Sequence, residues 1–231
     1  MNLLGGTTWQ EIPERPLLVV PLGAVEQHGP HLPLATDTRT AETVARAAAP
    51  GMDGALLAPA IAYGASGEHE GFPGTVSIGT EALTMLLVEY GRSACRWAGR
   101  LLVVNGHGGN FSALRAAVPQ LRAEGRDVAW WPCAVPGGDA HAGRVETSLM
   151  LHVEPGGVRE ELAEPGETAP LRELLPRMRA EGVRAVSPNG VLGDPAGASA
   201  DEGAELVADL AGRLVAAVRE WRVDPAGRLL E

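Results

Sequence analysis

The chain has 231 residues, of which 45% are apolar and 21% are charged, as in an ordinary globular protein. Its 29 acidic residues outnumber the 19 basic ones, and the formal net charge of -10 disfavours binding to a phosphate backbone. We therefore expect no nucleic-acid partner. No stretch approaches the roughly 20 uninterrupted apolar residues of a membrane span, so we expect no membrane partner either.

The first 14 residues lack the basic start and apolar run of a secretory signal, so we expect the chain to stay in the cytoplasm. Its two cysteines, Cys95 and Cys133, lie far apart among apolar neighbours, which indicates two reduced thiols. A chain of this length can form one α/β unit, so we expect a single domain over residues 1–231.

Short apolar runs alternate with helical patterns along the chain. The runs at 17–22, 100–104 and 128–131 predict buried strands, and another short apolar run covers 55–61. Helical patterns begin at residues 37, 80, 112, 146, 171 and 201, and proline and glycine make 154–170 an irregular surface segment. This alternation predicts a three-layer α/β/α domain with a mostly parallel sheet, and it leaves the strand order open.

Two carboxylates and two imidazoles follow the first strand within the stretch EQHGPHLPLATD, residues 26–37. If the chain remains extended, Glu26 and His28 point to the same face and can meet one metal centre. Asp37 arrives after a loop, and its two oxygens could bridge two ions, as in two-metal hydrolases. The alternative for Asp37 is an N-cap, because aspartate is favoured just before a helix.

Later segments deliver further polar groups. His107 follows the strand at 100–104 and lies between glycines, which allow a close approach to a ligand; the alternative is a structural histidine. His141 and Glu146 flank a predicted helix start, where the alternatives are a capping histidine and a solvated glutamate. Because ligands bind at the carboxyl ends of strands in open α/β sheets, this convergence predicts a site for Zn, Mn or Fe(II).

Three other histidines have weaker signals. His31 is expected to support the metal ligands from behind, His69 to line the pocket, and His152 to be structural.

The runs GAVEQHGPHLPLATD, GEHEGFPGT, VNGHGGN and HAGRVETSLML resemble the creatininase family of metal-dependent amidohydrolases, and the resemblance covers most of residues 7–152. Within that family, the order of the motifs and the short length are most similar to peptidases that release a C-terminal valine-tyrosine unit from a modified ribosomal precursor peptide. The resemblance implies a creatininase-like fold, a precursor peptide substrate and a homo-oligomer.

The same resemblance implies two divalent ions, Zn, Fe or Mn. One ion would take Glu26, Asp37 and His107, and the other would take His28 and Asp37, so that Asp37 bridges them.

Creatininases proper carry a glutamate two residues after the histidine of the NGH run, where this chain has Gly109. The second ion is therefore short of a ligand, and Glu146 is the candidate to complete it, or else to hold substrate or support a ligand. His141 matches the histidine to which the family assigns proton transfer.

We therefore predict a dinuclear metal hydrolase that cuts a peptide bond near the C-terminus of a modified peptide. One alternative is hydrolysis of a cyclic or formyl amide. Another is a metal-bound scaffold protein without catalysis, although structural zinc sites usually close with cysteines and this ligand set is rich in oxygen.

Overall fold

A five-stranded sheet forms the centre of the computed structural model, which describes residues 2–231. The strands pair in the order β1-β3-β2-β4-β5, and every pair is parallel. Helices cover both faces of a parallel sheet, which explains why the longer strands are continuous apolar runs. The strands are β1 (Asn2–Leu3), β2 (Leu17–Leu22), β3 (Leu56–Leu57), β4 (Arg100–Asn105) and β5 (Val128–Pro132).

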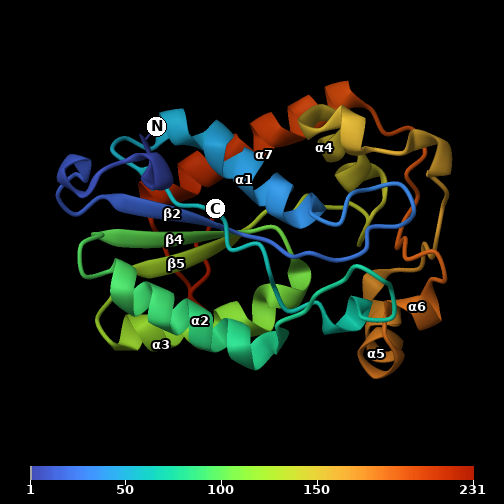
Figure 1. Cartoon of the computed structure of the whole chain (residues 1–231), viewed down its shortest axis with the longest axis horizontal. Coiled ribbons are helices and arrows are strands. Elements are labelled where there is room, and N and C mark those ends of the chain that lie inside the picture. The colour runs from blue at the N-terminus through green and yellow to red at the C-terminus, as the bar shows by residue number, and fades with distance from the viewer. Residues whose placement is uncertain (1) are drawn as a thin grey trace.

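Two layers of helices enclose the sheet, one on each face (Figure 1). One layer packs Val44, Leu149 and Leu210 against the sheet, and the other packs Leu83 and Leu114 against the opposite face. This arrangement confirms the predicted three-layer α/β/α fold. The first layer contains α1 (Thr36–Ala48), α4 (Arg144–Val153) and α7 (Ala200–Glu220), and the second contains α2 (Gly79–Ala94) and α3 (Phe111–Ala123).

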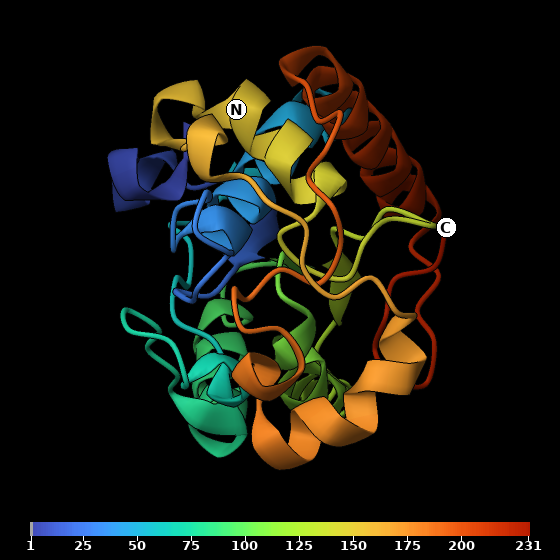
Figure 2. The same ribbon diagram turned by 90° about the vertical axis from the view of Figure 1, so that its right-hand side faces the viewer.

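A smaller group of helices lies beyond the carboxyl ends of the strands. It consists of α5 (Leu171–Glu181) and α6 (Val183–Val186), which share a small apolar cluster with Leu192. Figure 2 looks onto this end of the molecule, where long loops cross between α4 and α7 on one side and α5 on the other. This end therefore carries the loops that follow the strands.

The structure differs from the sequence-based expectation in several places, and the edge strand β1, which is only two residues long, was not predicted. Within the apolar run at 55–61, only Leu56–Leu57 forms a strand, and Pro59 has no N–H to donate to a neighbouring strand. Ala58 and Ile61 still donate to β2, at the carbonyls of Val19 (2.9 Å) and Pro21 (2.9 Å). The helix α6 was not predicted, since four residues are too few to show a helical period. None of the helices described for residues 2–231 is long and apolar enough to cross a bilayer.

The sheet order creates a switch point between β2 and β4. From β2 the chain passes through α1 to β3 on one side, and then through α2 on the opposite face to β4 on the other side. The loops that follow the carboxyl ends of β2 and β4 therefore diverge and leave a crevice between them. Open α/β sheets bind ligands in such a crevice.

Candidate metal centre

The site residues predicted from the sequence meet at this switch point. Glu26 and His28 follow β2, Asp37 lies in the first turn of α1, and His107 directly follows β4. His141 lies just before α4, and Glu146 lies in its first turn. The structure therefore brings all six predicted residues into one cluster, and the short turn Gly67–His69 adds His69 to it.

Asp37 is at the centre of the cluster. Its Oδ1 lies 3.1 Å from His28 Nε2, and its Oδ2 lies 3.3 Å from His107 Nδ1. The alternative of an N-cap is wrong, because α1 begins at Thr36, its N-cap is Ala35, and no side chain caps it. A buried carboxylate with one oxygen toward each of two imidazoles has the arrangement expected of a bridging ligand.

Glu26 is completely buried on the other side of His107. Its Oε2 lies 3.1 Å from His107 Nε2, so Glu26 and Asp37 face different nitrogens of this ring. Within residues 2–231, neither carboxylate oxygen of Glu26 accepts a hydrogen bond, and Asp37 Oδ2 accepts none. Buried charged oxygens without hydrogen bonds are costly, and a divalent cation would satisfy them, so these residues fit a metal ion.

Glu146 approaches the cluster from the side of His28. Its Oε2 lies 3.9 Å from His28 Nε2 and accepts a hydrogen bond from the backbone N–H of Ala142 (2.6 Å). The side chain is 25% exposed, so it is not the freely solvated glutamate of the alternative interpretation. It can reach an ion held by His28 or a group bound in the adjoining cavity.

The orientation of His141 follows from one hydrogen bond. Its Nε2 donates to the backbone carbonyl of Gln27 (2.8 Å), so in the neutral ring Nδ1 carries no hydrogen. That Nδ1 lies 3.8 Å from Glu26 Oε1 and faces the cluster. The ring is buried, against the alternative of an exposed capping histidine, and it can accept a proton at Nδ1.

His69 has the same tautomer as His141, with its hydrogen on Nε2. Two hydrogen bonds fix the orientation of the Gln27 side-chain amide. Its oxygen accepts from the backbone N–H of Gly29 (2.8 Å), and its nitrogen donates to the backbone carbonyl of Gly190 (3.0 Å). The same amide nitrogen also lies 2.8 Å from His69 Nδ1. His69 Nδ1 therefore accepts, and its hydrogen resides on Nε2, which lies 3.3 Å from Glu26 Oε1.

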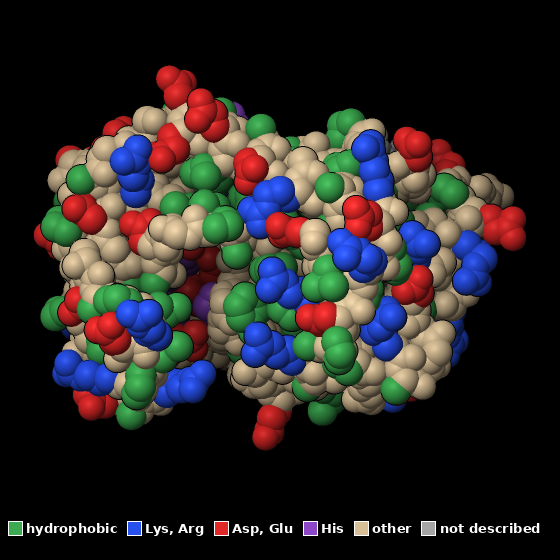
Figure 3. Space-filling model, turned by 180° about the vertical axis from the view of Figure 1, so that it is seen from behind, with side chains coloured by type: hydrophobic (Ala, Val, Ile, Leu, Met, Phe, Trp, Pro, Cys, Tyr) green, Lys and Arg blue, Asp and Glu red, His purple; other side chains and the backbone are tan. Residues whose placement is uncertain are grey.

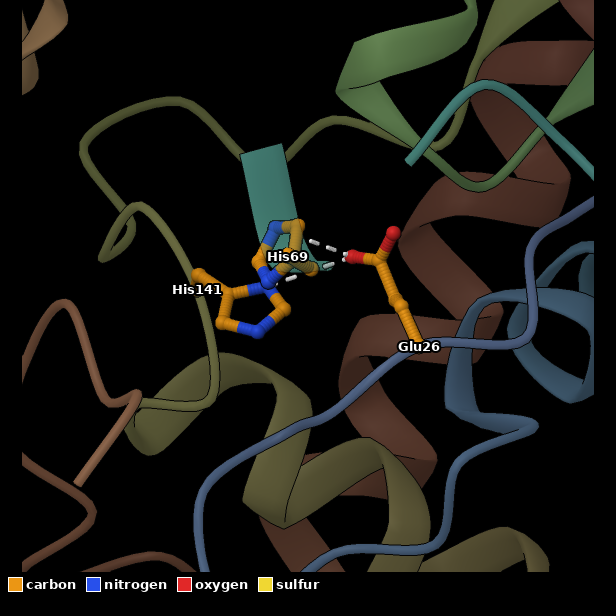
Figure 4. Close-up of side chains that lie close together, drawn as sticks. All are labelled: Glu26, His69 and His141. Atoms are coloured by element: carbon orange, nitrogen blue, oxygen red, sulfur yellow. Dashed lines mark ion pairs between the residues drawn. The ribbon is translucent and has the colours of Figure 1, made fainter. Parts of the chain in front are cut away.

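Glu26, His69 and His141 together have the spacing of a metal site (Figure 4). His69 Nε2 carries a hydrogen, however, and a ligating nitrogen must offer a lone pair. His69 therefore suits a role in holding the Glu26 carboxylate, while the other oxygen of Glu26 faces His107. The sequence pattern indicated only a pocket-lining position for His69 and no role for Gln27, whose partners are 42 and 163 residues away.

In the metal-free protein, raised pKa values favour protons on Glu26, His28 and His107, where a bound cation would otherwise balance the carboxylate charges. Burial opposes protonation of His28 and His107, but nearby carboxylates outweigh it and raise the pKa of each ring to about 10. The main carboxylate is Asp37 for His28 and Glu26 for His107. Burial raises the pKa of Glu26 to about 8, despite the opposite effect of His107. Burial also lowers the pKa of His69 to about 3 and holds the pKa of His141 well below its usual range.

Asn110, the last residue of the NGHGGN run, fixes the loops that carry the cluster. Its side chain donates to the carbonyl of Gly23 (3.0 Å) and to Asn105 Oδ1 (3.0 Å), and it accepts from the N–H of Ala65 (2.9 Å). It therefore joins the loops after β2, β3 and β4. Gly106 allows the close approach of α1, since a Cβ there would lie 2.2 Å from the carbonyl oxygen of Asp37.

The two remaining histidines lie outside the cluster. His31 is buried, and its Nε2 lies 2.9 Å from the Thr147 hydroxyl of α4, so it connects the loop after β2 to the helix that carries Glu146. His152 is exposed in the last turn of α4.

A cavity of about 1000 Å³ opens onto the cluster. Figure 3 shows the hollow in this face of the molecule, with histidine and acidic side chains visible inside it. Its volume is at the upper end of ordinary ligand pockets, so it can admit the end of a peptide. The lining includes Asp37, His107, His141 and Glu146 from the cluster and Glu68 from the loop after β3.

Comparison with known proteins identifies the family. The family model described as creatininase (creatinine amidohydrolase) matches residues 6–218. The chain belongs to the creatininase family of metal-dependent amidohydrolases. This result confirms the resemblance of the four sequence motifs and the hydrolase class that they predicted.

A relative from Mycobacterium tuberculosis, the mycofactocin precursor peptide peptidase, is 56% identical over 236 residues and covers 98% of this chain and 94% of its own. Two solved structures show the same creatininase fold. A Zn-Zn type creatininase variant has a TM-score of 0.77 at 27% identity, covering 95% of this chain and 97% of its own. A creatininase with Mn has a TM-score of 0.73 at 27% identity, and the match covers 95% of this chain and 98% of that chain.

Proposed function

We propose that this protein hydrolyses a peptide bond near the C-terminus of a modified ribosomal precursor peptide and releases a valine-tyrosine-derived unit in mycofactocin biosynthesis. The observation that carries the proposal is the 56% identity, over nearly the whole of both chains, to a mycofactocin precursor peptide peptidase. The cavity beside the cluster supports it, because a substrate approaching the carboxylates must enter there. A ribosomal precursor is made in the cytoplasm, where we place the reaction.

We propose two divalent ions as the cofactor, chosen among Zn, Fe and Mn. Asp37 would bridge them, Glu26 and His107 would hold one, and His28 with Glu146 would hold the other. The unpartnered buried oxygens of Glu26 and Asp37 support this assignment, as do the Zn and Mn forms of creatininase. When bound, such ions polarise the scissile carbonyl and lower the pKa of water toward about 7.

His141 is the group that we assign to proton transfer. Its unprotonated Nδ1 faces the cluster and its Nε2–H is fixed on the backbone of Gln27, so the ring can take a proton from the attacking water and deliver it to the leaving nitrogen. Burial holds its pKa well below the usual range, so the ring is neutral and Nδ1 is unprotonated before the step. His69 and Gln27 hold Glu26 and His141 in place during the step.

Mass spectrometry of the modified precursor peptide tests the function. Metal-loaded protein should shorten the peptide by the mass of its C-terminal dipeptide unit, and the Asp37→Asn variant should leave it intact. An unchanged peptide mass after long incubation with the metal-loaded wild type would contradict the proposal. Turnover of creatinine or of a formyl amide instead would favour the alternative amide hydrolase.

We also propose that the chain forms a homo-oligomer. Large apolar side chains at the surface support this, notably Trp9, which is 82% exposed, and Met85 on α2, which is 68% exposed. Light scattering of the full chain should give a mass above that of the monomer, 24.0 kDa. A monomeric mass would contradict it.

A further inference from the structure

One carboxylate beside the centre has no role in the proposed reaction. Glu68 lies on the short turn Gly67–His69 and points into the cavity, where its side chain is 29% exposed. Its Oε1 lies 3.8 Å from His107 Nε2. The adjoining residue, His69, is buried against Glu26, so the backbone that carries Glu68 is fixed at the edge of the cluster.

Four oxygens lie within 4 Å of His107 Nε2. Glu26 Oε2 and the carbonyl oxygen of Ala65 are each 3.1 Å from this nitrogen, the Ser66 hydroxyl is 3.5 Å away, and Glu68 Oε1 is 3.8 Å away. Ligands bonded to one ion at about 2.1 Å stand roughly 3.0 to 3.4 Å from each other. Glu68 Oε1 is the farthest of the four, and its side chain would have to rotate toward His107 to meet the same ion.

The neighbouring backbone leaves room for this carboxylate. A Cβ at position 109 would lie 2.6 Å from Glu68 Oε1, 2.3 Å from His107 Nε2 and 2.4 Å from the carbonyl oxygen of Ala65. No side chain fits at position 109 without displacing these groups. Gly109 therefore keeps open the space in which Glu68 faces His107.

Glu26 supplies a second observation that points to a cation here. It is completely buried, and neither of its oxygens accepts a hydrogen bond within residues 2–231. An ion between Glu26 Oε2 and His107 Nε2 would be enclosed by protein on every side except the cavity. Glu68 lies on that open side.

We propose that Glu68 is a ligand of the ion held by Glu26 and His107. This inference rests on the proposed dinuclear function, and it adds a fourth carboxylate to the centre on the side of His107, opposite Glu146 on the side of His28. The position is rich in oxygen, which suits Mn²⁺ or Fe²⁺ better than a softer ion.

Calorimetric titration of the metal-depleted full chain with Mn²⁺ tests the assignment, with metal content by mass spectrometry after dialysis as the second readout. Wild type should bind about two ions. Glu68→Ala and Glu68→Gln should weaken one of the two binding steps by about tenfold or more and leave the other unchanged. Both variants should fold, since the Glu68 side chain is partly exposed.

Glu70→Ala is the matched control, because Glu70 is an exposed carboxylate two residues further along the same loop. It should leave both steps unchanged. The assignment would be overturned if both binding steps of the Glu68 variants matched those of the wild type. It would also be overturned if both steps weakened equally and Glu70→Ala had the same effect. Either result would leave the dinuclear centre intact. A wild type that binds no Mn²⁺, Zn²⁺ or Fe²⁺ would overturn the proposed function itself.

Discussion

His141 donates its Nε2 hydrogen to the backbone carbonyl of Gln27 at 2.8 Å, and this one bond gives the ring a free Nδ1 facing Glu26. Gln27 lies between two proposed metal ligands, Glu26 and His28, so the backbone that presents the ligands also orients the proton carrier. The metal centre and the proton-transfer group are therefore fixed relative to each other by one short segment.

Replacing His141 should separate the chemistry from metal binding. We expect His141→Gln to lower kcat by about 10²–10⁴-fold, the usual contribution of a positioned acid–base group, while metal content remains that of wild type. Steady-state kinetics on the precursor peptide and metal analysis of the same sample check both parts. A large loss of metal would mean that His141 is a ligand.

Replacing Asp37 should have the opposite pattern. Because Asp37 faces both His28 and His107, Asp37→Asn should remove metal and lower kcat/KM by about 100-fold or more. Circular dichroism should show a folded protein, since asparagine has nearly the same size. If part of the Asp37→Asn protein is unfolded but the remaining folded protein keeps its metal and activity, Asp37 has a structural role only.

Metal binding should release protons at neutral pH. In the metal-free protein, the raised pKa values of about 10 for His28 and His107 keep both rings charged at pH 7, and Glu26, at about 8, is mostly protonated. An ion must displace these protons, so its affinity should rise with pH from about 6 to about 9. A pH-indicator dye in weak buffer measures the release, and a pH-independent affinity would contradict the account.

Gly190 should be intolerant of a side chain. It has a φ of +83°, and a Cβ there would lie 1.9 Å from the side-chain oxygen of Gln27. Gly190→Ala should cost the backbone strain of about 1–3 kcal/mol and further displace Gln27, so that activity falls as well as stability.

Gly54→Ala is the matched control for this prediction. Gly54 has a φ of +70°, and apart from Gly54 and its two chain neighbours no heavy atom of residues 2–231 lies within 4 Å of the position that a Cβ would take, so its substitution introduces backbone strain without a clash. Chemical denaturation and peptide cleavage should show a smaller loss of stability and unchanged activity. Equal effects of the two substitutions would mean that the contact with Gln27 has no importance.

Much of the fold was predictable because local patterns decide it. The apolar run at β2 predicted a buried strand, which the structure confirms, and the polar stretch with Glu26 and His28 follows its carboxyl end; that these two residues are metal ligands stays a prediction. The strand order was not predictable, because it depends on which strands pair across the sheet rather than on any local period.

The parts of the site that local patterns do not predict depend on long-range contacts. His69 approaches Glu26 from a distant loop of the chain, and Gln27 acts through Gly190 and His141, so no local spacing indicates either role. Glu68 was visible in the sequence only as one acidic residue of a glycine-rich loop. Its relation to His107 and Gly109 becomes evident once the loops after β3 and β4 lie together.

The most direct test of the central claim is a crystal structure of the metal-loaded protein with anomalous scattering recorded at the edges of Zn, Fe and Mn. The account predicts two anomalous peaks on either side of the Asp37 carboxylate, one beside Glu26 and His107 and the other beside His28. A structure grown with excess metal that shows no peak within bonding distance of Asp37 would contradict it.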